Sequence, residues 1–194
     1  MGPLARKLDE RFTYGDYLLW DDDQRWELID GVPFAMSPAP RLRHQRVLVE
    51  LSRQIANYLL DKPCQLFVAP FDVRLPEADE NDDQVETVVQ PDLSVICDSA
   101  KLDDAGCRGA PDLIMEILSP GTAHIDLQIK LDRYERAGVR EYWIVDPLEK
   151  TVLLFTRAAD RRYGRPEIYG DDDPVKVRIF PDLEVALTSV FMER

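Results

Sequence analysis

The chain has 194 residues, a length that favours one domain with a hydrophobic core of its own. Apolar residues make up 45% of the chain and charged residues 31%, which is the balance of an ordinary globular protein. The net charge of −13 at pH 7 repels polyanions, so a nucleic acid could bind only through a locally basic surface, a bound metal or a partner.

Composition also limits location and metal chemistry. No apolar run reaches the roughly 18 residues of a spanning helix, and the first residues lack the apolar core of a signal peptide, so we expect a cytoplasmic protein without membrane contact. Cys64, Cys97 and Cys107 have no CxxC spacing, which argues against a disulfide framework or a zinc ribbon. Cys97 stands in a strand-like run and is expected to be a small core residue. His44 and His124 are too few for a His-rich metal site.

The first elements expected along the chain are a short helix, a hairpin and a longer helix. The capping-box spacing of Thr13 and Asp16 predicts a helix to about Leu19. Asp30-Gly31, between apolar runs, predicts a two-residue hairpin turn. Apolar positions then recur at helical spacing over residues 42–60. Because cations at a helix start oppose the helix dipole, contact with phosphate stays open beside simple solvation as the reason for four basic side chains there. These side chains are Arg41, Arg43, His44 and Arg46.

The middle of the chain is expected to form strands separated by an acidic loop. Residues 65–74 indicate a strand pair, or one strand kinked at Pro70. Residues 76–86 are acidic and short of apolar side chains, which is typical of a mobile, solvated loop. Two apolar runs follow, Pro91–Cys97 and Pro111–Leu118, and each has the length and composition of a strand.

A second long helix and further strands complete the expected order. Thr122 is the candidate N-cap of this helix and Gly138 its expected end. Strands are expected over residues 141–146 and 151–156, and short strands over residues 163–191. This order predicts a mixed sheet with helices on its faces.

Each of the two apolar runs carries one acid. Glu116 stands inside an otherwise apolar run, where an ionised carboxylate is costly unless it is paired or bound to a metal. Asp92 follows Pro91 at the start of the other run. Magnesium takes one or two carboxylates together with water and substrate oxygens, and a nearby Lys can help to activate an attacking water. Asp92 and Glu116 are therefore candidate ligands of a metal that promotes phosphodiester hydrolysis. The alternatives are a polar strand-start residue for Asp92 and an Arg partner for Glu116.

Further motifs follow one another in order along the chain: Glu27-Leu-Ile-Asp-Gly, His44 at a helix start, Ala69-Pro-Phe-Asp-Val-Arg, Val89-Gln-Pro-Asp-Leu, Ala110-Pro-Asp-Leu, Glu116-Ile-Leu-Ser-Pro, Asp126 with Lys130 and Tyr134, and Gly138-Val-Arg-Glu-Tyr-Trp-Ile-Val-Asp-Pro. Over residues 13–191 they resemble the Uma family of restriction endonucleases, within the PD-(D/E)XK nuclease superfamily. The resemblance implies an α/β (mixed α+β) fold with a restriction-endonuclease-like core, a mixed central sheet flanked by helices, in one domain over residues 1–194. It also implies a magnesium (or manganese) cofactor, nucleic acid and foremost DNA as partner, and a homodimer.

Carried over residue by residue, the resemblance makes Asp92 the acid of the PD motif and Glu116 the second acid, both of them metal ligands. Two residues after this second acid the superfamily usually has Lys, whereas this chain has Leu118. Lys130, on the following helix, matches the displaced catalytic Lys, and Glu27 matches a further catalytic acid that could complete the metal shell.

Several alternatives remain open beside these roles. His44 is an accessory candidate on the water or phosphate side of the site, or simply a helix-start side chain. Lys130 could be half of a surface ion pair with Asp126, four residues earlier, and Glu27 could be a strand-edge charge. Asp112 repeats the PD motif, and we interpret it as a strand-start residue. Three aromatic residues are expected in the core: Tyr134, Tyr142 and Trp143.

Two functions are consistent with these residues. The first is a metal-dependent endonuclease that uses Asp92, Glu116 and Lys130. The second is a catalytically weak nuclease-fold module that binds nucleic acid or regulates a partner. Leu118 and the acidic surface favour the second function, whereas the retained acids and Lys130 favour the first. No nucleophile elbow, Walker loop or dinucleotide-binding motif is present in the sequence.

Overall fold

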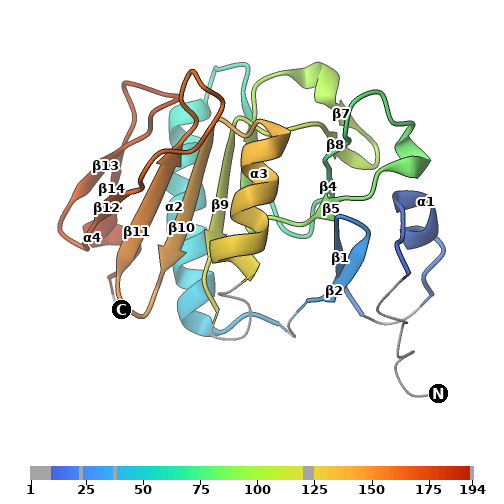
Figure 1. The fold of residues 1–194 in the computed structure, drawn as a ribbon. Helices are drawn as coiled ribbons and strands as arrows, with labels where there is room; N and C mark the ends of the chain where they lie inside the picture. Colours follow the sequence, from blue (N-terminus) through green and yellow to red (C-terminus); the bar gives the residue numbers. More distant parts are fainter. Residues whose placement is uncertain (1–9, 22–23, 37–38, 120–124, 193–194) are drawn as a thin grey trace.

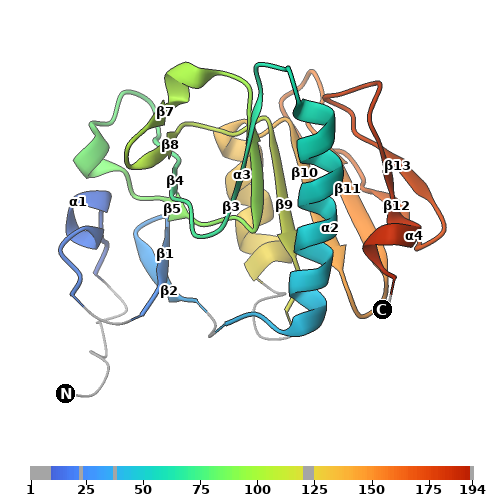
Figure 2. The ribbon, with the colours of Figure 1, turned by 180° about the vertical axis from the view of Figure 1, so that it is seen from behind.

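A computed structural model describes residues 10–21, 24–36, 39–119 and 125–192. Six strands form a mixed central sheet, in the order β12 (Glu167–Tyr169), β11 (Thr151–Thr156), β10 (Glu141–Asp146), β9 (Leu113–Ile117), β6 (Leu93–Ile96) and β3 (Gln65–Val68). The pair β9 and β10 is parallel and the other neighbours are antiparallel. Helix α2 (Leu42–Leu59) covers one face and α3 (Leu131–Ala137) the other (Figures 1 and 2). The predicted mixed sheet with helices on its faces is confirmed.

Strand β9 divides its side chains between the two faces of this sheet, because successive strand residues point to opposite sides. Leu113, Met115 and Ile117 pack in the hydrophobic cluster that includes the buried side of α2. Ile114 packs in the cluster that includes Tyr134 of α3. Glu116 follows the same alternation and lies on the α3 side, where Tyr134 contacts it. All five residues of β9 are buried, as predicted for a strand covered on both faces.

A second six-stranded sheet lies beside the first, and its strands are β2 (Val32–Ala35), β1 (Trp26–Ile29), β5 (Val88–Val89), β4 (Val73–Arg74), β8 (Gly106–Arg108) and β7 (Leu102–Asp103). The predicted hairpin is confirmed: β1 and β2 pair around Asp30 and Gly31, whose φ angles of 47° and 74° suit a tight primed turn. Helix α1 (Tyr14–Tyr17) carries the predicted capping box of Thr13 and Asp16, although it ends before Leu19.

Short elements complete the described chain. They are η1 (Asp82–Gln84), η2 (Ser99–Lys101), the π-helical η3 (Ile125–Lys130), the hairpin of β13 (Pro174–Lys176) with β14 (Glu184–Ala186), and α4 (Leu187–Val190). Gly138 ends α3 with a φ of 96°, as predicted, whereas the candidate N-cap Thr122 and its neighbours 120–124 lie outside the described residues. Within the described residues, no helix combines the length and the apolar character needed to cross a bilayer.

Cys97 packs against the hydrophobic core, as expected, but it is only partly buried and forms a disulfide with Cys64 that was not expected. Strands β3 and β6 are antiparallel with Gln65 opposite Ile96, so the next residue pair outward brings the two cysteines face to face. Cys107 is the free, buried thiol. Sequence spacing does not reveal this pairing, since it depends on the register of two strands.

The expectation of a solvated acidic loop over residues 76–86 holds only in part, because two of its acids pair with buried arginines. Asp82 pairs with Arg74, which is only 1% exposed, and Glu77 pairs with Arg133, which is 2% exposed. A buried guanidinium needs an anionic partner, because an unpaired charge removed from water is costly. Acids of this segment therefore neutralise arginines that the fold buries.

Candidate active site

The paired strands β6 and β9 bring the two predicted acids together. Leu93 lies opposite Met115 in this antiparallel pair. Asp92, just before Leu93, and Glu116, just after Met115, therefore lie at the same end of the strand pair. The Asp92 N–H donates to Oε2 of Glu116 over 3.4 Å, and the Ile117 N–H donates to Oδ2 of Asp92 over 2.8 Å. The Asp92 side chain keeps 20% of its surface exposed, whereas Glu116 is buried. Asp92 is thus the more accessible carboxylate of the pair.

Lys130 reaches this pair from the end of η3, directly before α3. Its Nζ lies 2.8 Å from Oε1 of Glu116, 2.8 Å from Oε1 of Glu27 and 3.5 Å from Oδ1 of Asp126. Lys130 and Asp126 are each 4% exposed, so the alternative of a surface ion pair is wrong. Lys130 is therefore a buried ammonium surrounded by carboxylates and does not belong to the solvated surface.

Glu27 connects the second sheet to this cluster. Its Oε1 accepts a hydrogen bond from the Gln90 N–H at 2.8 Å, in addition to the contact with Lys130. Gln90 stands two residues before Asp92. Glu27 therefore contacts both the Lys130 ammonium and the backbone just before the PD motif. Glu27 is 5% exposed, which excludes the alternative of a strand-edge charge in water.

His44 approaches Asp92 from the first turn of α2 on the opposite face of the sheet. Its Nε2 lies 3.1 Å from Oδ2 of Asp92. Its other ring nitrogen, Nδ1, is buried and makes no hydrogen bond with the part of the chain that the structure describes. The five candidate residues of the sequence, Glu27, His44, Asp92, Glu116 and Lys130, therefore lie in one connected group.

Sequence reasoning missed two members of the group. The Tyr134 hydroxyl donates to Oε1 of Glu116 at 2.8 Å, although the residue was expected only as core, and it is indeed fully buried. The sequence places Asp126 in the family pattern with Lys130 and Tyr134 but assigns it no role beyond an ion pair with Lys130. Asp126, Lys130 and Tyr134 are spaced by four residues, a pattern that places them on one helix face and could have pointed to both. Asp112, in contrast, accepts from the Cys97 N–H and from Arg140, away from the group.

The electrostatics of the group follow from its burial. Burial raises the pKa of Glu116 to about 8, against the opposing effect of the Lys130 ammonium. Burial alone would lower the pKa of Lys130. The attraction of Glu116, Glu27 and Asp126 is stronger than this effect, so the pKa lies well above its ordinary value. The group thus holds one stable ammonium among more carboxyl groups than it can neutralise. An added cation would offset the remaining negative charge.

The oxygen donors of Asp92 and Glu116 fit a magnesium or manganese ion. Magnesium takes one or two protein carboxylates and completes its shell with water and substrate oxygens. Within the described residues, no group of three or more His, Cys, Asp or Glu side chains has the arrangement of an all-protein metal cage. Two carboxylates, one of them partly exposed, suit an ion that shares its coordination with substrate.

Comparisons with known proteins bear on the family and the fold of the chain. The Uma2 family model, described as "Putative restriction endonuclease", matches residues 14–188. An uncharacterised protein of Synechocystis is 26% identical over 141 residues, which are 72% of this chain and 65% of that protein, so the chain spans just under two thirds of this relative. A crystal structure described as "a putative nuclease belonging to DUF820 from Anabaena variabilis" superposes with a TM-score of 0.73. The identity is 19%, and 93% of this chain and 97% of the other are covered, so the two share a fold.

Proposed function

The chain belongs to the Uma2 family, and on that premise we propose that it is a metal-dependent endonuclease that hydrolyses phosphodiester bonds of nucleic acid, foremost DNA. The observation that carries the proposal is the meeting of Asp92, Glu116 and Lys130, which come from three separate elements, in one cluster. A structural role alone gives no reason to gather three buried carboxyl groups around one lysine, because each buried charge is costly.

In this proposal Asp92 and Glu116 hold a magnesium or manganese ion. When bound, such an ion supplies a Lewis acid that neutralises phosphate charge and lowers the pKa of a bound water. His44 donates from Nε2 to the ionised Asp92 carboxylate and so fixes its orientation. Tyr134 does the same for Glu116 through its hydroxyl. These contacts keep the two carboxylates in place before substrate arrives.

Lys130 assists the attacking water through its charge. Because the neighbouring carboxylates raise its pKa, it stays an ammonium and does not take the proton of the water. An ammonium close to the reacting phosphate stabilises the negative charge that develops there. Glu27 holds this ammonium at 2.8 Å and is a positioning residue in the proposal.

A second candidate is a nuclease-fold module that binds nucleic acid or regulates a partner without efficient cleavage. Two observations favour this candidate: Leu118 stands in place of the usual Lys, and Lys130 already forms ion pairs with Glu116 and Glu27. The two candidates differ in one measurable respect: only the first predicts turnover.

The test is cleavage of plasmid and single-stranded oligonucleotides by the purified chain with magnesium or manganese. We expect products that chelator suppresses and that Asp92→Asn abolishes. Asp112→Asn is the matched control, because it changes the second PD motif, whose carboxylate contacts Cys97 and Arg140 away from the cluster. Equal cleavage by wild type and Asp92→Asn would refute the proposal. Metal binding without cleavage would favour the second candidate. Light scattering on the same samples tests the homodimer that the resemblance implies.

A further inference from the structure

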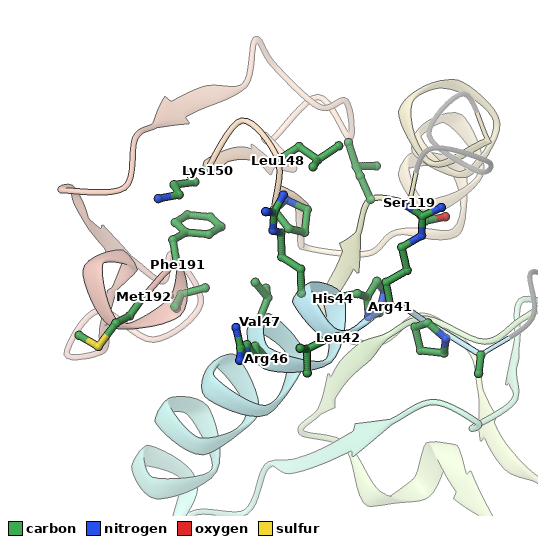
Figure 3. Close-up of a pocket in the computed structure, with 16 residues that line it drawn as sticks. Arg41, Leu42, His44, Arg46, Val47, Ser119, Leu148, Lys150, Phe191 and Met192 are labelled. Atoms are coloured by element: carbon green, nitrogen blue, oxygen red, sulfur yellow. The ribbon is translucent and has the colours of Figure 1, made fainter. Parts of the chain in front are cut away.

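A cavity of about 740 Å³ (Figure 3) is lined by His44, which contacts Asp92 of the carboxylate cluster. Its wall is formed by the start of α2, the residues that follow β9, the turn between β10 and β11, and the end of the chain after α4. Leu118, two residues after Glu116, lines the cavity as well. A molecule in this cavity would therefore lie next to the proposed metal ligands.

The charge of the cavity is opposite to that of the protein. Four basic side chains line it, Arg41, Arg43, Arg46 and Lys150, and none of its 16 described lining residues is Asp or Glu. The whole chain, in contrast, has 37 acidic and 24 basic residues. Arg41, Arg46 and Lys150 have no carboxylate partner among the described residues of this acidic chain, and such side chains suit an anionic ligand.

The start of α2 supports the same ligand charge. The helix has 18 residues, begins at Leu42 without a side-chain cap, and has no acid in its first turn. The N–H groups of its first turn and its dipole favour an anion at this end, which also accounts for basic residues that otherwise oppose the dipole.

The cavity also has an apolar part, which further restricts the chemical class of ligand that fits it. Leu42, Leu148 and Met192 line it and are 67%, 60% and 52% exposed, and the ring of Phe191 lies on its wall (Figure 3). The phosphate backbone of a continuous duplex would use the cations but not this apolar surface. An unpaired nucleotide would use both, because an unstacked base packs on apolar and aromatic side chains while its phosphate meets the cations.

We propose that this cavity holds one unpaired nucleotide of the substrate beside the cleaved bond. Arg41, Arg46 and Lys150 contact the phosphates of this nucleotide and of its neighbours in the strand, and its base lies against Leu148 and Phe191. The chain then acts on single-stranded or frayed nucleic acid in preference to continuous duplex. This inference rests on the proposed function, since the cavity matters for cleavage only if Asp92 and Glu116 form the reacting centre.

The experiment is fluorescence anisotropy with a labelled 12-nucleotide single strand and the matching duplex, in chelator so that no metal-dependent cleavage occurs. We expect the single strand to bind at least about tenfold more tightly than the duplex. Arg41→Gln/Arg46→Gln should weaken single-strand binding by about tenfold and flatten its salt dependence. Leu148→Ser should weaken it by about fivefold or more, because it removes packing against the base. Arg53→Gln, further along α2 and paired with Glu50, is the control and should bind as wild type does.

Each outcome is decisive for one of the two proposals. Equal affinity for both strands forms, or an unchanged affinity in the double Arg variant, would overturn the cavity assignment. Preferential capture of an acidic, apolar peptide by the same residues would overturn it in favour of a protein partner. Tight, variant-sensitive binding of single strand, with no cleavage when the same strand is incubated with magnesium or manganese, would support the cavity and count against the nuclease. Efficient cleavage of continuous duplex would support the nuclease and count against the cavity.

Discussion

Replacing Lys130 with Met tests whether this ammonium holds the carboxylate cluster together. The change removes the cation that lies 2.8 Å from Glu116 and Glu27 and 3.5 Å from Asp126, and Met fills a similar volume. Removing one partner of a buried charge group leaves the others uncompensated and costs about 3–5 kcal/mol of folding free energy. Such a loss is a large part of the roughly 5–15 kcal/mol that stabilises a typical domain.

The loss should depend on pH in a defined direction. Burial already raises the pKa of Glu116 to about 8, and removal of the ammonium, which opposes this shift, raises it further. The folded state then keeps a proton that the unfolded chain releases above its ordinary pKa of 4.5. Stability of Lys130→Met should therefore be highest below this value and fall as pH rises toward 8.

Urea unfolding followed by tryptophan fluorescence, at pH 5 and pH 8, measures this loss for Lys130→Met against wild type. Lys176→Met is the matched control, because Lys176 is 61% exposed and its loss should cost at most about 0.5 kcal/mol. A penalty for Lys130→Met below about 1 kcal/mol, or one that is equal at both pH values, would refute this account of the cluster.

Three further outcomes follow from the structure. Burial raises the pKa of the Cys107 thiol to about 11, so a thiol reagent at pH 7.5 should react only after unfolding, with one thiol per chain, and with three after reduction of the Cys64–Cys97 disulfide. Gly106→Ala should lower the free energy of unfolding in urea by about 2 kcal/mol or more, because the φ of Gly106 is +124° and a Cβ would lie 2.2 Å from a backbone oxygen. Tyr134→Phe removes a hydroxyl that donates to a buried carboxyl group and should cost about 1–2 kcal/mol by the same assay; an unchanged midpoint would contradict that contact.

Much of the fold could be predicted because local patterns are strong. The apolar runs that became β6 and β9, the Asp30-Gly31 turn and the helical spacing that became α2 each indicate one structure with little competition. The proximity of Asp92 and Glu116 follows from the pairing of two neighbouring strands whose acids stand at matching ends. The family resemblance was confirmed by the match over residues 14–188.

What could not be predicted depends on contacts between distant segments. The Cys64–Cys97 disulfide needs the register of β3 against β6, and the burial of Arg74 needs the packing of the acidic loop against the second sheet. The basic start of α2 was visible in the sequence, but Lys150 reaches the same cavity from a turn about one hundred residues away.

The proposed endonuclease depends above all on the binding of a divalent metal by Asp92 and Glu116. Calorimetric titration of manganese into wild type, Asp92→Asn, Glu116→Gln and the control Asp112→Asn tests it most directly, with circular dichroism to show that each variant is folded. We predict one site of micromolar to millimolar affinity in wild type and Asp112→Asn, and its loss in Asp92→Asn and Glu116→Gln. Unchanged binding in both of these variants, or no binding by wild type with or without an oligonucleotide, would contradict the claim.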